Sequence, residues 1–207
     1  YVAGIVAYGL SVTMDNCTNE VDVTATKNGY AAGVISYIGG TGSTITRCTN
    51  KGAISGFGGY VGGIAGTASS MTIQNCFNSG KVSSTATPKT YTTGVGGIVG
   101  GMSSGKVVRC GNTANGEISS TIKRAGGIVG AFVGTIEKCF NAGSVTGIYE
   151  VAGIAGNINS STASTILDCY NLGSVTCKAP TGTMSEKYSK SIGGIVSNPS
   201  NYSYKAT

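Results

Sequence analysis

Seven cysteines carry the most reactive side chains of this chain, and six of them recur at a spacing near thirty residues. Each of the six is followed two positions later by an asparagine. The pairs are Cys17/Asn19, Cys48/Asn50, Cys76/Asn78, Cys110/Asn112, Cys139/Asn141 and Cys169/Asn171. Thiols at a regular spacing could ligate a metal ion, form disulfides, act as nucleophiles or pack as small apolar groups.

The rest of the sequence disfavours the first three of these roles. Without a histidine or a Cys-x-x-Cys pair, a tetrahedral metal site is disfavoured, and Ser-His-Asp and Cys-His nucleophile systems are ruled out. In stacked β-coils, neighbouring Cβ atoms lie near the strand spacing of about 4.8 Å, whereas a disulfide needs roughly 3.8 Å. We therefore predict a buried ladder of free thiols. Cys177 lies outside this column, and its exposure stays open.

Carboxylates are too few and too scattered to suggest catalysis. The chain has only eight Asp and Glu residues, whereas glycosidases pair two carboxyl groups within about 5–9.5 Å. Glu137 and Asp168 could lie on adjacent coils, but their offsets from the nearest cysteine differ, so we expect them to point apart. We predict no catalytic residue, no metal, no cofactor and no enzymatic activity.

Tyrosines offer a better candidate for ligand binding. Tyr1, Tyr30 and Tyr60 stand three residues before a repeated glycine, and Tyr8 and Tyr37 stand four residues after it. Both sets are expected to stack into short ladders. Exposed rings of this kind could hold a sugar or a peptide, because they combine apolar faces with a polar tip. Alternatively, they stack only on one another at the coil corners.

Two insertions are longer than the other connections between repeats, at residues 83–93 and 176–191. In a solenoid such insertions leave from one face, which is often the binding face. The candidate ligand-binding residues are therefore Tyr30, Tyr37 and Tyr60 from the ladders, with Tyr91, Lys187 and Tyr188 from the insertions. Alternatively, the insertions are surface loops without a binding role.

The elements that must position these residues also repeat. A Gly-apolar segment recurs at Ala3–Val6, Ala32–Ile35, Gly62–Ala65, Gly96–Val99, Gly126–Val129, Ala152–Ala155 and Gly193–Val196. Each repeat then shows an apolar segment that leads into the cysteine and a short apolar-hydroxyl alternation after the asparagine. Such short segments separated by glycines predict three short strands per repeat rather than helices. Repeats that stack at about 4.8 Å give an all-β, right-handed parallel β-helix of about six coils.

Columns of identical residue types predict the interior. Ile45 and Cys48 are both expected to point inward, although a spacing of three breaks strict alternation, so a bend must lie between them. The residues that directly follow the repeated Gly-Ile, such as Ile35 and Val99, form another apolar column. We therefore expect this column and the Ile column before it both to be buried. The structural ladder includes the asparagines Asn50, Asn78, Asn112, Asn141 and Asn171. We expect each to form a turn and to bond its amide to the copies above and below.

The repeat boundaries predict a single solenoid over residues 1–207. Its coils lie near 1–29, 30–59, 60–93, 94–123, 124–149 and 150–190, with a partial seventh coil or cap at 191–207. The chain opens at Tyr1, almost on a repeat boundary, which favours a segment of a longer, exported protein. The net charge of +6 is spread over scattered basic residues, so no nucleic-acid surface is expected. No apolar stretch is long enough to insert into a membrane.

Taken together, Gly-Gly-Ile-Val-Gly followed by Thr-Ile-x-x-Cys-Phe/Tyr-Asn-x-Gly-x-Val resembles the GLUG repeat across essentially the whole chain. That repeat occurs in large bacterial surface proteins and in the repeat region of immunoglobulin-A-specific metallopeptidases. The zinc motif of those peptidases needs histidines, which are absent here, so no protease activity carries over. The resemblance implies a non-catalytic segment of a secreted or cell-surface-attached bacterial protein.

Three functions remain open on this basis. The first is an adhesin-like binding or spacer module that recognises a host glycan or extracellular protein beside flanking domains of the same chain. The second is a carbohydrate-active β-helix whose catalytic residues lie in flanking sequence. The third is an inert structural stalk.

Overall fold

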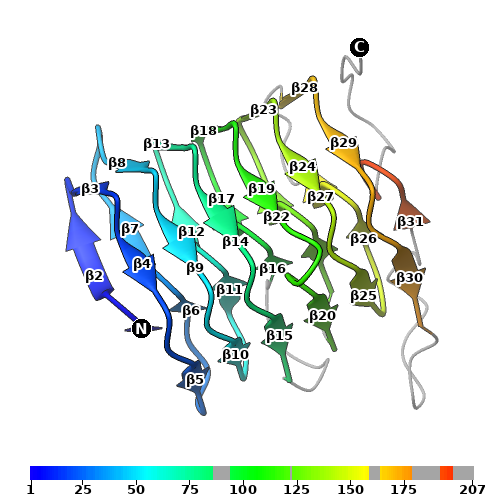
Figure 1. Cartoon of the computed structure of the whole chain (residues 1–207), viewed down its shortest axis with the longest axis horizontal. Helices are drawn as coiled ribbons and strands as arrows, with labels where there is room; N and C mark the ends of the chain where they lie inside the picture. The colour runs from blue at the N-terminus through cyan, green and yellow to red at the C-terminus, as the bar shows by residue number, and fades with distance from the viewer. Residues whose placement is uncertain (86–93, 122, 159–163, 179–191, 198–207) are drawn as a thin grey trace.

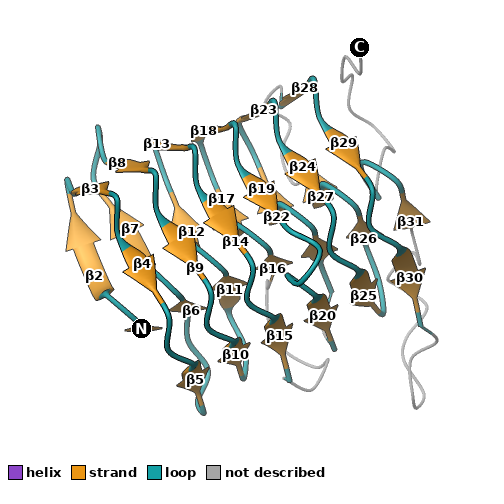
Figure 2. Cartoon of the chain, viewed as in Figure 1, coloured by secondary structure: helices purple, strands orange, loops and turns teal. Residues whose placement is uncertain are grey.

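A computed structural model describes residues 1–85, 94–121, 123–158, 164–178 and 192–197. The regular elements of these residues are all strands, and each pairs in parallel with the equivalent strand of the next coil (Figure 1; Figure 2). No helix that could cross a membrane is found among them. The prediction of an all-β parallel solenoid is confirmed.

Five parallel sheets run along the coil stack, and we number them in chain order. The first contains β1 (Val2–Ala3), β6 (Ala31–Ala32), β11 (Tyr60–Gly62), β16 (Gly94–Gly96), β21 (Ala125–Gly126), β26 (Val151–Ala152) and β31 (Ile192–Gly193). The second contains β2 (Val6–Leu10), β7 (Ile35–Gly39), β12 (Ala65–Ala68), β17 (Val99–Met102), β22 (Val129–Phe132) and β27 (Ala155–Ile158).

The other three sheets complete the coil. The third contains β3 (Thr13–Asp15), β8 (Thr44–Thr46), β13 (Met71–Gln74), β18 (Gly105–Val108), β23 (Thr135–Glu137) and β28 (Thr165–Leu167). The fourth contains β4 (Thr18–Asn19), β9 (Thr49–Asn50), β14 (Phe77–Asn78), β19 (Gly111–Asn112), β24 (Phe140–Asn141) and β29 (Tyr170–Asn171). The fifth contains β5 (Val23–Ala25), β10 (Ile54–Gly56), β15 (Val82–Ser84), β20 (Ile118–Ser120), β25 (Val145–Gly147) and β30 (Val175–Cys177).

Five strands per coil replace the three that the sequence predicted, because two predicted strands are each divided by a corner. The Gly-apolar segment breaks into a first-sheet and a second-sheet strand, as between β6 and β7. The segment around the cysteine breaks into a third-sheet and a fourth-sheet strand, as between β8 and β9. Strands of two residues are too short to produce a periodic signal, so the sequence pattern merged them with their neighbours.

The corner before each cysteine is made by a residue in the left-handed region. Arg47 (φ 54°), Arg109 (φ 50°) and Lys138 (φ 53°) share this position. The bend expected between Ile45 and Cys48 is therefore confirmed. The ladder asparagines have no positive φ, but each ends a strand and donates its amide to the carbonyl of the turn that follows, as Asn50 does to Gly52, so they support that turn through the side chain rather than through a left-handed backbone. One left-handed residue suffices for the corner, which leaves the asparagine free to extend inward.

Two apolar clusters fill the interior. The larger one joins the inner faces of the second and third sheets and includes Ile35, Ile45 and the buried cysteines. The smaller one joins the fifth and first sheets through residues such as Ile54 and Val61. Ile35 and Val99 are fully buried, so the burial expected for the column after Gly-Ile is confirmed.

The asparagine ladder crosses the coil to the repeated glycine on the opposite wall. A Cβ atom at Gly63 would lie 2.5 Å from Cγ of Asn78, and one at Gly97 would lie 2.7 Å from Cγ of Asn112. The glycine and the asparagine that define the repeat are therefore contact partners. A side chain at the glycine would occupy the space that the amide fills.

Candidate ligand-binding groove

The cysteine column of the structure is a packing element. The backbone N–H of Cys48 donates to Sγ of Cys76 at 3.4 Å, and the same contact repeats from Cys76 to Cys110, from Cys110 to Cys139 and from Cys139 to Cys169. Burial raises the pKa of the Cys110 thiol well above its usual range. The seven cysteines are thiols rather than disulfides, and no cluster of potential metal ligands occurs among the described residues.

Cys177 lies outside this column, on β30. It is half-buried against the smaller apolar cluster, and its thiol donates to the carbonyl of Ile148 at 3.1 Å. Cys17 and Cys169, at the two ends of the column, are also only half-buried.

The asparagine column is a continuous chain of amide hydrogen bonds. Nδ2 of Asn50 donates to Oδ1 of Asn78 at 2.8 Å, and Nδ2 of Asn78 donates to Oδ1 of Asn112 at 2.7 Å. The chain begins at Asn19 and continues through Asn141 to Asn171. Each amide also donates to a carbonyl of its own turn, such as Gly80 O for Asn78. These side chains are therefore fully used by the fold.

The predicted tyrosine ladders meet in one cluster on the outside of the first and second sheets. The ring centroids of Tyr8 and Tyr37 lie 5.2 Å apart and nearly parallel, and those of Tyr30 and Tyr60 lie 5.5 Å apart. Tyr1 connects the two sets, because its centroid lies 4.9 Å from that of Tyr37 and 5.4 Å from that of Tyr30. Sequence spacing alone did not show that the two ladders join.

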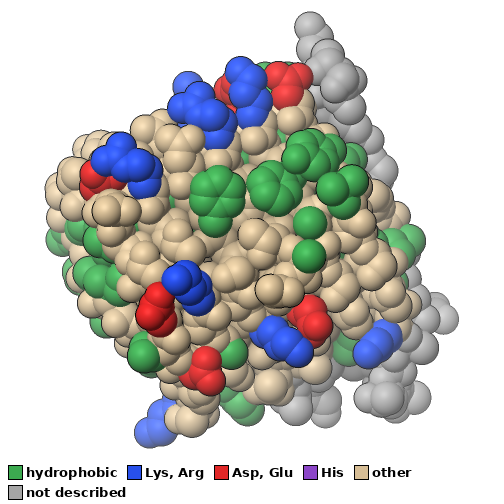
Figure 3. All heavy atoms as spheres, viewed as in Figure 1, with side chains coloured by type: hydrophobic (Ala, Val, Ile, Leu, Met, Phe, Trp, Pro, Cys, Tyr) green, Lys and Arg blue, Asp and Glu red, His purple; other side chains and the backbone are tan. Residues whose placement is uncertain are grey.

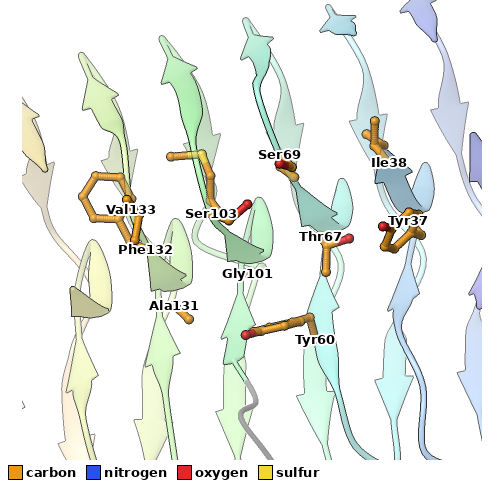
Figure 4. A pocket seen from close by; sticks show the side chains of 12 residues that line it. Tyr37, Ile38, Tyr60, Thr67, Ser69, Gly101, Ser103, Ala131, Phe132 and Val133 are labelled. Carbon is orange, nitrogen blue, oxygen red and sulfur yellow. The ribbon is translucent and has the colours of Figure 1, made fainter. Parts of the chain in front are cut away.

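A groove of about 360 Å³ begins where the tyrosine cluster ends. The outward column of the second sheet changes along the stack from Tyr37 to Thr67, Gly101 and Ala131. Because the large rings give way to small residues, the outer face is hollowed over β7, β12, β17 and β22. Figure 4 shows the lining, which comprises Tyr37, Ile38, Tyr60, Thr67, Ala68, Ser69, Gly101, Met102, Ser103, Ala131, Phe132 and Val133.

Tyr60 forms one side of the groove and extends from its own coil over the next (Figure 4). Its ring covers Gly101, where a Cβ atom would lie 2.5 Å from the ring carbons. Thr67, between Tyr37 and Gly101 in the column, has a buried Oγ1 with no hydrogen-bond partner in the described part of the chain. The groove therefore combines an aromatic side with a polar atom that lacks a partner.

Of the residues predicted for ligand binding, Tyr37 and Tyr60 line the groove. Tyr30 does not line it, but it packs against both rings, stacked on Tyr37 and tilted against Tyr60. Tyr91, Lys187 and Tyr188 lie outside the described residues, as does the cap expected at Asn198 to Thr207. Sequence reasoning missed Thr67, Gly101 and Ala131. The available signal was the replacement of Tyr37 by small residues at equivalent positions of later repeats.

A second aromatic row, not predicted from the sequence, lies on the fourth sheet. Phe140 packs 6.4 Å from Phe77 and 5.6 Å from Tyr170, measured between ring centroids. Phe77 is 40% exposed and Tyr170 52% exposed. Figure 3 shows hydrophobic side chains gathered over this face. Phe140 covers the position of Gly111, because a Cβ atom there would lie 2.3 Å from its ring.

Burial of the tyrosine cluster predicts a loss of stability at alkaline pH. Burial raises the pKa of Tyr60 above its usual value of about 10, against an opposing effect of the Arg124 cation, and burial also raises the pKa of Tyr30. A raised pKa in the folded state means that folding favours the neutral phenol. The resulting contribution to stability is complete below the pKa of the unfolded state and is lost as pH rises through the pKa of the folded state. The free energy of unfolding should fall from roughly pH 10 upward.

Urea unfolding at several pH values tests this expectation, with Tyr60→Phe as the control. The phenylalanine variant should lose less stability over the alkaline interval, because it has no phenol to ionise at this position. An equal loss in both proteins would show that ionisation of Tyr60 is not linked to folding.

Comparison with known proteins supports the architecture. Residues 57–83 match the family model of the GLUG motif, so the predicted GLUG repeat is present in the chain. Among solved structures, the chain is similar to a candidate immunoglobulin A1 protease from Bacteroides ovatus, with a TM-score of 0.66 and 21% sequence identity. The match covers 99% of this chain and 66% of that one. No curated protein matches.

Proposed function

We propose that this chain is a non-catalytic binding module of an extracellular bacterial protein, and that it recognises its ligand at the tyrosine-lined groove. The observation that carries the proposal is the groove itself, where Tyr37 and Tyr60 flank a hollow of about 360 Å³. Cavities of this size lined by aromatic groups and a few polar atoms are typical of small-ligand sites. The ligand is a host glycan or a segment of an extracellular protein.

The distribution of charge supports a non-catalytic role. The carboxylates of Asp15, Glu20 and Glu117 each pair with a basic side chain of a neighbouring coil. None of these carboxylates lines the groove. General acid–base chemistry on a sugar needs two carboxyl groups on either side of the scissile bond, and the described lining provides none. Catalytic residues in flanking sequence remain the alternative for a carbohydrate-active protein.

The GLUG motif and the solenoid shared with a candidate protease support the extracellular, surface-attached assignment. A spacer role is the second candidate. It is favoured by the amide ladder, which links every coil from Asn19 to Asn171 and so stiffens the stack. A spacer and a binding module differ in one respect that can be measured, namely specific ligand binding at the groove.

Tyr60→Ala is expected to abolish or strongly reduce binding on an array of glycans and extracellular-matrix proteins, because it removes one side of the groove. Tyr170→Ala is the control, since it deletes an exposed tyrosine that belongs to the second aromatic row and does not line the groove. Circular dichroism of both variants confirms that the solenoid is intact. Reproducible binding that is lost only in Tyr60→Ala supports the proposal. Binding that is unchanged in Tyr60→Ala, or a blank array with the folded parent protein, favours the spacer.

A further inference from the structure

The residues that line the groove carry no formal charge. Its described lining contains tyrosine, serine, threonine, glycine and apolar residues, but no Lys, Arg, Asp or Glu. The Arg124 cation acts electrostatically on Tyr60, and it is paired with Glu150, whose Oε2 lies 2.9 Å from Nε of Arg124. These side chains are only 11% and 16% exposed, so they neutralise each other rather than present a free charge. A charged ligand group in the groove would therefore lose solvation without gaining a counterion.

The direction of the groove follows from the sheet. It crosses four neighbouring strands, β7, β12, β17 and β22, and therefore runs along the solenoid axis, at right angles to the strands. Three steps of about 4.8 Å give it a length of roughly 14 Å. An elongated molecule can lie in it, with successive units over successive coils.

Strand addition by a peptide is not available at this place. β12 pairs on one side with β7 and on the other with β17, and β17 pairs in turn with β22. The backbone groups of these strands are used within the sheet, so a bound peptide could not gain the main-chain hydrogen bonds that give extended peptides their affinity. The groove offers side chains only.

Those side chains match the surface of a sugar. A pyranose ring has C–H groups on its faces and hydroxyls around its rim, and an aromatic ring offers an apolar face of the same kind. Tyr60 provides such a ring beside the small residues Gly101 and Ala131. The hydroxyls of Ser69, Ser103 and Thr67 lie in the lining, and Oγ1 of Thr67 has no partner among the described residues. Because Oγ1 is buried, a ligand hydroxyl satisfies it only after a rotation about χ1 of Thr67 turns the hydroxyl into the groove.

We propose that the groove binds a short, unbranched, uncharged oligosaccharide that lies along the solenoid axis, with Thr67 and Tyr60 as its principal contacts. This inference rests on the proposed function and specifies its ligand class. Ala131 determines access, because a larger side chain at this position would fill the space that the sugar occupies, whereas the space over Gly101 already holds the Tyr60 ring.

The test uses two sets of linear oligosaccharides, from disaccharides to hexasaccharides. The neutral set contains gluco-, xylo-, manno- and galacto-oligosaccharides and oligomers of N-acetylglucosamine, and the anionic set contains uronic-acid and sulfated oligomers. Binding to the intact chain is measured at low and high salt. The inference expects binding within the neutral set that strengthens with length and then levels off, with little effect of salt.

Two variants locate that binding. Ala131→Phe fills the groove, and Thr67→Val deletes the unpartnered hydroxyl at nearly constant shape. Each is expected to weaken binding of the neutral oligosaccharide about tenfold or more. Tyr170→Ala on the second aromatic row should leave it unchanged. Because Ala131→Phe could disturb the sheet, Thr67→Val is the decisive variant, with thermal unfolding as the check on its fold.

The outcomes separate this inference from the proposed function. Neutral binding that Thr67→Val weakens supports both. Preferential, salt-sensitive binding of the anionic set overturns the ligand class but leaves the proposed function standing. Binding of a matrix protein that Tyr60→Ala abolishes has the same consequence. Neutral binding that persists in Thr67→Val and Ala131→Phe overturns the inference. An absence of any binding by the folded chain overturns both.

Discussion

Replacing Gly97 by alanine is expected to disrupt the solenoid. The added Cβ would lie 2.1 Å from the carbonyl oxygen of Gly127 and 2.7 Å from Cγ of Asn112. The first of these atoms belongs to the backbone of the next coil, so it cannot move without separating the coils. Because the backbone cannot move away from the added methyl group without breaking contacts between coils, we expect a loss of roughly 4 kcal/mol or more in the free energy of unfolding.

The chain offers a matched control for this prediction in Gly194, which occupies the equivalent position of a later coil. An alanine Cβ at Gly194 has no atom of the described residues within 4 Å. Gly194→Ala should therefore change the urea midpoint little, whereas Gly97→Ala should lower it sharply or prevent folding. Similar midpoints for the two variants would mean that coil contact at the repeated glycine does not limit stability.

Asn78→Ala is expected to have the second-largest effect, because it interrupts the amide ladder at a fully buried position. Its side chain donates to Oδ1 of Asn112 and to the carbonyl of Gly80, and it accepts from Nδ2 of Asn50. Alanine removes all three hydrogen bonds, which takes the donor from two buried acceptors and the acceptor from one N–H of Asn50. At about 1–3 kcal/mol for each unsatisfied group, we expect a loss of roughly 3–5 kcal/mol in the free energy of unfolding.

The control is Asn171→Ala at the end of the ladder. Asn171 is half-buried, and water can replace some of its partners. Its substitution should cost about 1 kcal/mol. Urea denaturation of both variants measures the difference. If the two losses were equal, the ladder would contribute through isolated turns rather than as a connected network.

These two predictions concern one structural element, since the repeated glycine and asparagine touch across the coil. Gly63 faces Asn78, and Gly97 faces Asn112. The pair separates the two apolar clusters and holds opposite walls of the coil at a fixed distance. A rigid framework of this kind suits both a binding module and a spacer, because it keeps the outer groove in one shape.

Much of the fold could be predicted from the sequence. The spacing of the cysteines indicated stacked coils, and the columns that contain Ile35 and Ile45 were correctly assigned to the interior. The number of strands was wrong, because two-residue strands such as β9 have no periodic pattern. The bend before the cysteine was predicted, but the left-handed residue that makes it, such as Arg47, was not. Arginine is not a usual left-handed residue, so its type gave no signal.

The candidate site was predicted only in part. Tyr37 and Tyr60 were selected because their positions in the repeat are equivalent to those of other tyrosines. The groove next to them arises from residues without chemical distinction, Gly101 and Ala131, which a search for reactive or aromatic groups passes over.

The sequence by itself determined which residues stack on which, because a parallel solenoid places each residue directly against its copy one repeat away. The thiol column, the amide ladder and the two tyrosine sets are all contacts of this kind. Only the tertiary structure decided which columns face each other. The contact between glycine and asparagine, the joining of the tyrosine sets and the position of the groove depend on the corners of the coil. Those corners are set by single backbone conformations, such as the left-handed residue before each cysteine, and a repeat period carries no information about their angles.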